Sequence, residues 1–194
     1  MEQRVKKIDE FNANDRIDIK LLDNSIHFLT GEITEENINA CIKWITYENL
    51  ATKNEKLLTL YINSTGGDLY QAFALIDIMT NSQYPIRTIG IGSIMSAAFL
   101  IFSAGDKGER YIAKNTGIMC HQFSGGGEAK YHDMKAEMKE NDSLNSKMVE
   151  ILKNATGKAP SVIRKKLLPP SDVYLTAEEL IELGVADHIL GSTE

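Results

Sequence analysis

A buried strand followed by an apolar helix recurs three times in the sequence, and this pattern most limits what the chain can fold into. Each strand is a short continuous apolar run, and each helix carries apolar residues three or four positions apart. The strands cover 25–29, 57–62 and 86–91; two of the helices cover 35–49 and 97–103, and the apolar stripe of the middle helix covers 72–79. Strands without polar alternation are buried on both faces, so the pattern predicts an α/β fold of parallel β-α units.

The second half of the sequence predicts a helix that is too long for its own domain. Short strands at 110–112 and 117–122 and a glycine-rich turn at 124–127 lead into a polar segment over 128–154. A helix of about 26 residues is about 39 Å long at 1.5 Å per residue. We expect it to project and to meet something else, such as a second copy of the chain. A capping box at 176–179 predicts a short helix, and 185–190 predict the last strand.

Composition indicates one globular domain without nucleic-acid or membrane partners. The chain has 194 residues, of which 43% are hydrophobic and 25% charged, and a net charge of −6 without a dense basic run. Two cysteines make no disulfide framework and no zinc pattern, so we expect a reducing, cytoplasmic compartment and no metal or cofactor. We expect residues 1–20 to form a polar, irregular and mobile arm and residues 21–194 a single domain. The apolar run 88–104 reads as strand plus helix rather than as a membrane span.

Two residues stand where chemistry is expected. His121 follows the apolar run 118–120 at the end of a buried strand, and strand ends are where sites collect in β-α folds. Ser96 directly precedes the apolar helix 97–103. It is either the N-cap of that helix or a nucleophile beside the free amides of the first turn, and the residues leave both open. Cys120 adjoins His121, but neighbours on a strand point to opposite faces, so Cys120 is expected in the core.

The loop 64–68 (Ser-Thr-Gly-Gly-Asp) has three interpretations. It is a phosphate cradle, a tight strand-to-helix turn, or a source of backbone N–H groups for an anion formed during a reaction. The Gly-x-x-x-x-Gly-Lys pattern is absent, which makes nucleotide binding improbable.

Four motifs in order resemble the Clp protease proteolytic subunit (ClpP) family. They are Tyr61-Ile-Asn-Ser-Thr-Gly-Gly67, Ile89-Gly-Ile-Gly-Ser-Ile-Met-Ser96, Met119-Cys-His-Gln122 and Asp172-Val-Tyr-Leu-Thr-Ala-Glu179. The likeness extends from about Ser25 to Leu190 and rests on the order and spacing of the four motifs. It implies the ClpP/crotonase-type fold of repeated β-β-α units, with a projecting handle segment at about 123–157.

The resemblance also implies a site. Ser96 is the nucleophile, His121 the general base and then acid, and Asp172 the residue that orients and stabilises the imidazole. Backbone N–H groups of Gly67 and Ala97 form the oxyanion hole. The substrate is bound by Gly66, Ser124, Gly125 and Gly126, the last three as part of an added strand.

The activity implied is that of a core serine endopeptidase without an ATP motif of its own. Heptameric rings stacked as a tetradecamer enclose the sites, so that substrates are short peptides and unfolded polypeptides fed by an ATP-driven (AAA+) unfoldase.

Some residues depart from the family pattern. Thr65 replaces a usual proline, Ala97-Ala98 replace Met-Gly, and Ser171 replaces an arginine of the ring–ring contact. Thr59 and Asn81 replace aromatics of the unfoldase pocket, where Tyr61 and Tyr111 remain.

Two other classes of function stay open at this point. One is a catalytically silent ring subunit that assembles with active relatives. The other is a crotonase-like acyl-CoA enzyme, whose oxyanion hole would stabilise an enolate.

Overall fold

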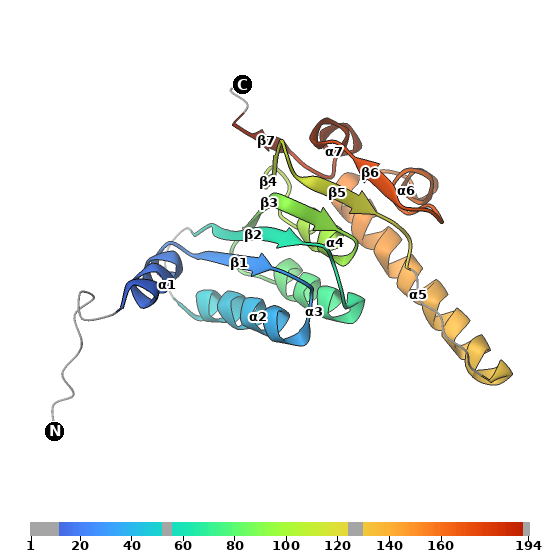
Figure 1. The fold of residues 1–194 in the computed structure, drawn as a ribbon, viewed down its shortest axis with the longest axis horizontal. Helices are drawn as coiled ribbons and strands as arrows, with labels where there is room; N and C mark the ends of the chain where they lie inside the picture. The colour runs from blue at the N-terminus through green and yellow to red at the C-terminus, as the bar shows by residue number, and fades with distance from the viewer. Residues whose placement is uncertain (1–11, 52–55, 124–129, 192–194) are drawn as a thin grey trace.

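The structure is a computed structural model that describes residues 12–51, 56–123 and 130–191. Helices lie against a central twisted sheet (Figure 1). The helices are α1 (Ala13–Asp23), α2 (Glu35–Leu50), α3 (Leu69–Thr80), α4 (Ala97–Ser103), α5 (Tyr131–Thr156), α6 (Pro160–Lys166) and α7 (Ala177–Leu183). The strands are β1 (Ile26–Thr30), β2 (Leu58–Ser64), β3 (Ile86–Met95), β4 (Arg110–Ala113), β5 (Gly117–Cys120), β6 (Val173–Leu175) and β7 (His188–Leu190). The predicted α/β class is confirmed.

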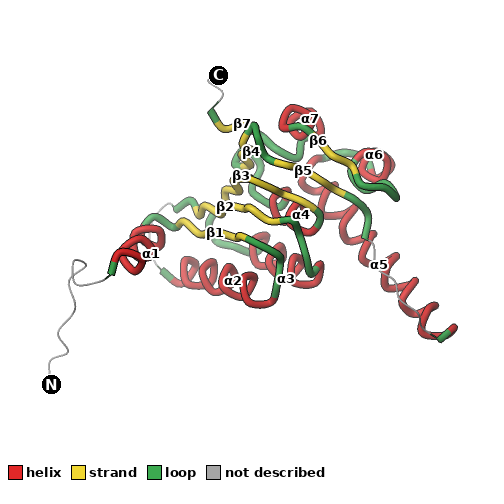
Figure 2. The backbone as a smooth tube through the Cα atoms, viewed as in Figure 1, coloured by secondary structure: helices red, strands yellow, loops and turns green. Residues whose placement is uncertain are grey.

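The sheet is parallel except at one edge. Strands β1, β2, β3, β4 and β7 follow one another in parallel, and β5 pairs with β3 and with β6. Strand β3 acts as two strands in succession, because 88–90 pair with β4 and 93–95 pair with β5. Strand β6 is antiparallel to β5 and lies beside it in the tube view (Figure 2). This branch of the sheet carries the candidate site.

The apolar run 88–104 forms most of β3 and all of α4, as predicted. Every residue of α4 is buried, which explains why this helix is apolar on all sides. Helices α2, α3 and α4 lie on one face of the sheet (Figure 1). Within the three described stretches, no helix is long and apolar enough to cross a membrane.

Three elements were not predicted from the pattern. Helix α1 covers part of the segment expected to be irregular, which corrects that expectation for residues 13–20. Asn12 caps it by accepting a hydrogen bond from the Asp15 amide at 2.9 Å, and none of its residues is buried, although Ile17 and Leu21 are spaced as on one face of a helix. Helix α6 and strand β6 are too short for periodicity to reveal. Mobility of the arm remains a prediction, and residues 1–11 lie outside the described residues.

A buried ion pair ties the far end of the sheet to α5. Arg110 on β4 is 1% exposed, and its Nε and Nη2 donate to the two carboxylate oxygens of Asp187 at 2.8 and 2.6 Å. The Nη1 of Arg110 donates to the carbonyl of Ala155 near the end of α5 at 3.0 Å. Burial by itself raises the pKa of the Asp187 carboxyl, but the hydrogen bonds and charge of Arg110 and the Gly108 amide outweigh it, so the pKa is lowered.

The lowered pKa predicts an acid-labile contribution to stability. The pair contributes fully above the pKa of an unfolded aspartate, about 3.9, and its contribution is lost as pH falls through the lower folded pKa. Replacing Asp187→Asn leaves a buried guanidinium without its counter-ion and is expected to cost about 3–5 kcal/mol at pH 7. Urea unfolding from pH 7 to pH 3 should show the wild-type and variant free energies converging at the acid end.

A matched control is Glu109→Gln, which removes the partner of Arg87 in a pair that is about 30% exposed on both sides. Such a pair contributes only about 0.2–1 kcal/mol. A loss for Asp187→Asn no larger than this control, or one independent of pH, would contradict the assignment.

Candidate active site

Strand pairing brings Ser96 and His121 to the same edge of the sheet. Ser96 directly follows β3 and His121 directly follows β5, and these strands are parallel with Met95 opposite Met119. The Ser96 amide extends this ladder by donating to the Met119 carbonyl at 2.9 Å. Carboxyl ends of parallel strands lie at one edge, and here the Ser96 Oγ and the His121 Nε2 are 2.8 Å apart. With Nε2 unprotonated, the hydroxyl donates to it.

The backbone of Ser96 is strained, and its side chain does not cap the helix. Its φ of 52° and ψ of −122° are rare for a residue with a Cβ, and its hydroxyl makes no capping hydrogen bond to α4. The capping interpretation is therefore wrong. A sharp, strained strand-to-helix turn holds a side chain out at the top of a sheet, as it does for the nucleophilic serine of α/β-hydrolases.

Gly66 allows the neighbouring loop to approach this turn closely. Its φ is +97°, and a Cβ at this position would lie 2.8 Å from both the Met95 carbonyl oxygen and the Ser96 Cβ. Both the conformation and the space therefore require glycine. The interpretation of residues 64–68 as a tight turn holds, and the turn is packed directly against Ser96.

Two backbone amides beside Ser96 are available to a ligand. The Ile33 amide donates to the Gly66 carbonyl at 2.8 Å and the Asp68 amide to the Ile33 carbonyl at 3.0 Å, which fixes the loop on both sides of Gly67. The amides of Gly67 and Ala97 donate to no carbonyl in the turns, loops and caps of the described chain. Ala97 is the first residue of α4, where amides have no partner within the helix and the helix dipole favours negative charge.

Asp172 directly precedes β6 and makes no hydrogen bond to His121, which directly follows β5. The antiparallel β5–β6 ladder ends at the pair Cys120–Val173, and one further step of the same register would place His121 opposite Asp172. Residues opposite each other in such a pair have Cβ atoms about 4.5–5.5 Å apart. Asp172 is nevertheless exposed and makes no hydrogen bond among the described residues. The structure thus brings Ser96 and His121 into contact and leaves the Asp172 carboxylate without a hydrogen bond among the described residues.

A cavity of about 360 Å³ opens at Ser96 and His121. Its walls include Thr65, Gly67 and Ala97, together with the apolar side chains Leu69, Met119, Phe123 and Met148. These four residues come from α3, β5, the segment after β5, and α5. Sequence reasoning missed them, because an apolar residue that lines a cavity cannot be told by type from one that fills the core.

Other residues of the sequence analysis have ordinary structural roles or lie outside the described chain. Cys120 is 1% exposed in the core, as predicted, and burial raises the pKa of its thiol to about 12, so it stays protonated. Ser124, Gly125 and Gly126 lie outside the described residues. Nowhere in the part of the chain that the structure describes do three or more His, Cys, Asp or Glu side chains gather as metal ligands would.

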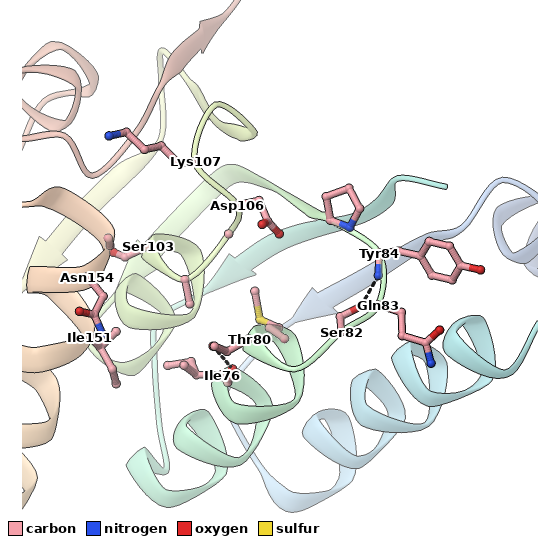
Figure 3. A pocket seen from close by; sticks show the side chains of 15 residues that line it. Ile76, Thr80, Ser82, Gln83, Tyr84, Ser103, Asp106, Lys107, Ile151 and Asn154 are labelled. Atoms are coloured by element: carbon pink, nitrogen blue, oxygen red, sulfur yellow. Dashed lines mark hydrogen bonds between the residues drawn. The ribbon is translucent and has the colours of Figure 1, made fainter. Parts of the chain in front are cut away.

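A second hollow, of about 500 Å³, lies between the ends of α3 and α5 and the start of β3 (Figure 3). Several of its polar side chains form hydrogen bonds with the backbone: Thr80 donates to the Ile76 carbonyl, and Ser82 accepts from the Tyr84 amide. Asp106 accepts from the Ile86 amide at 2.7 Å. No nucleophile lies beside a base there, so the Ser96 cavity is the better candidate for chemistry.

One comparison with known proteins bears on the site. The family model described as Clp protease matches residues 9–193, which include every described residue of the cavity.

The strain at Ser96 predicts that a glycine variant is more stable than an alanine variant at this position, the reverse of the usual order in a helix. Ser96→Ala and Ser96→Gly both lose the bond to His121, but only glycine relieves the backbone strain, which is worth about 1–3 kcal/mol. We expect the glycine variant to have the larger free energy of unfolding, by about 1 kcal/mol after the entropy cost of glycine. Urea unfolding of both variants measures the difference.

Ser146 in the interior of α5 provides the control, since it is an exposed, ordinary helical position. There the glycine variant should be less stable than the alanine variant by about 1 kcal/mol. The same order at both positions would refute strain at Ser96.

Proposed function

The chain belongs to the Clp protease family, and on that premise we propose that it is a serine endopeptidase with Ser96 as its nucleophile. The observation that carries the proposal is the 2.8 Å contact between the Ser96 Oγ and the His121 Nε2 at the head of a buried helix. A family match alone implies a peptidase of the ClpP type. The contact supports the assignment of its nucleophile and base.

In the proposed mechanism His121 takes the proton from Ser96 as the hydroxyl attacks the peptide carbonyl. Negative charge develops on the carbonyl oxygen, and the Gly67 and Ala97 amides stabilise it in the tetrahedral intermediate. His121 then gives its proton to the leaving amine, which breaks the peptide bond and leaves an acyl group on Ser96. Water, activated by the same imidazole, hydrolyses the ester.

Asp172 is proposed to orient His121 through the other ring nitrogen, Nδ1. The β5–β6 register supports this role, because its continuation by one residue would set Asp172 opposite His121, and opposite residues of an antiparallel pair have Cβ atoms about 4.5–5.5 Å apart. An Asp172 carboxylate without a hydrogen bond also favours one rival hypothesis, a catalytically silent ring subunit. For an active enzyme the His121–Asp172 bond has to form at a later stage, and we propose that it forms in the assembled enzyme or when substrate binds.

The proposed substrates are short peptides and unfolded polypeptides. Gly66 and residues 124–126 would hold the substrate backbone as an added strand, which reads little of its sequence. The apolar wall made by Leu69, Met119, Phe123 and Met148 supports a preference for an apolar side chain next to the cleaved bond.

Assembly into stacked heptameric rings, giving a tetradecamer, is part of the proposal. Helix α5 extends beyond the sheet (Figure 1) and keeps Met134 and Met138 exposed, at 43% and 66%. An exposed apolar side chain on a projecting helix supports a contact with a second copy. The ring is proposed to be cytoplasmic.

An AAA+ unfoldase is the proposed partner, and an aromatic row across the sheet supports a docking place for it. Phe28, Tyr61, Ile89, Tyr111 and His188 stand opposite one another in consecutive strands. Phe28 stacks on Tyr61 and Tyr111 stacks on His188, with ring centroids 4.8 and 4.6 Å apart. Phe28 remains 43% exposed.

Loss of the nucleophile should abolish the activity. Ser96→Ala is expected to lower kcat for a fluorogenic peptide by a factor that approaches about 10⁶, the loss seen when a triad serine is removed. Ser93→Ala, three residues earlier on β3, changes a serine outside the cavity and should leave kcat unchanged. Unchanged turnover in Ser96→Ala would contradict the assignment of the nucleophile.

One experiment separates the alternatives. A fluorophosphonate probe should label Ser96, and the native mass of the same sample should report the number of subunits. A ring that assembles but does not react would favour the silent subunit. Binding of acyl-CoA by an unreactive protein would favour the crotonase-like enzyme.

A further inference from the structure

His121 belongs to the short segment 121–123, which follows strand β5. A side chain of α5 holds this segment in place. On the basis of the proposed peptidase function, we propose that Asn145 is a positioning residue: it accepts a hydrogen bond from the Phe123 amide and thereby keeps His121 beside Ser96. Asn145 belongs to none of the four motifs and does not touch the reacting atoms.

The amides of this segment make two hydrogen bonds in the described structure after β5 ends at Cys120. The Gln122 amide donates to the Pro169 carbonyl over 3.4 Å, which is longer than the usual 2.7–3.2 Å for N–H···O. The Phe123 amide donates to the Asn145 Oδ1 at 2.8 Å. The bond to Asn145 is therefore the stronger of the two that restrain residues 121–123.

The acceptor itself is held rigidly. Leu144 and Met148, on either side of Asn145 in α5, are 1% and 4% exposed, so this part of the helix is fixed by packing. Met148 and Phe123 both line the cavity at Ser96. Asn145 thus joins a fixed helix to the segment that carries the base. Misplacement of a catalytic group by about 1 Å can cost about 10²-fold in rate.

The proposed role of Asn145 requires only a side-chain oxygen that accepts a hydrogen bond, and the test variants are chosen accordingly. The donor is a backbone N–H, and the Asn145 amide nitrogen has no partner among the described residues, so an aspartate can take its place. Asn145→Ala removes the acceptor and favours the helix. Asn145→Leu removes it at similar volume. Asn141, one turn earlier, is also half-buried, its side chain makes no hydrogen bond in the described chain, and Asn141→Ala is the matched control.

The test consists of two kinetic measurements on the assembled protein. The first gives the rate constant for labelling Ser96 with a fluorophosphonate, and the second gives kcat and KM for a fluorogenic peptide. We expect Asn145→Ala and Asn145→Leu to lower the labelling rate and kcat by about 10- to 100-fold with little change in KM. Asn145→Asp should stay within about threefold of wild type, and Asn141→Ala should match wild type.

Hydrogen exchange at the Phe123 amide gives a readout that does not need activity. Exchange should be faster in Asn145→Ala and unchanged in Asn145→Asp, even if the wild-type ring proves silent and the proposed function fails. Wild-type rates in both Asn145→Ala and Asn145→Leu would overturn the inference and leave the peptidase assignment intact. So would an Asn145→Asp variant as slow as Asn145→Ala, or unaltered exchange at Phe123 in Asn145→Ala.

Discussion

The register of three strands is the constraint on which the rest of the site depends. Strand β5 pairs in parallel with β3 and antiparallel with β6, so the carboxyl ends of two strands and the amino end of the third lie at one edge. Ser96, His121 and Asp172 are the residues next to those ends. A slip of one residue in either ladder would turn the side chains to the opposite face and separate them. Backbone hydrogen bonds between strands, rather than contacts among the three side chains, therefore bring these positions to one edge.

Strain at Ser96 persists because the structure around it leaves no alternative. The helix that follows is buried at every position, so the turn cannot relax by moving α4. Gly66 packs against the Ser96 Cβ from the other side. Next to the hydroxyl, the amides of Gly67 and Ala97 donate to no carbonyl in the turns, loops and caps of residues 12–51, 56–123 and 130–191, and an amide in the first turn of a helix has no partner within that helix. Strain and unused donors at one point are the features expected of a site that stabilises charge in a transition state.

Helix α5 connects the site to the rest of the molecule at several points. Near its end, the Ala155 carbonyl accepts from the buried Arg110. In its middle, Asn145 and Met148 reach the wall of the cavity that carries His121. Nearer the start of the helix, Glu140 accepts from the Tyr70 hydroxyl at 2.9 Å. Tyr70 directly follows Leu69, which lines the cavity. A helix that projects from the domain thus also contacts both walls of the cavity, and any contact made by its projecting part has a short physical path to the proposed base.

The sequence by itself determined the α/β class, the places of the long elements and the family, because buried strands, amphipathic helices and the four motifs are local patterns of residue type. It also put His121 at a strand end and Cys120 in the core, because side chains alternate along a strand. Only the tertiary structure decided that Ser96 does not cap its helix, that Gly66 must be glycine, that Met148 lines the cavity, and that the Asn145 side chain accepts from the Phe123 amide. Those facts depend on which distant segments approach within a few ångströms. Helix α1, helix α6 and strand β6 escaped prediction for a related reason: they are short or exposed, and capping and pairing rather than an apolar pattern stabilise them.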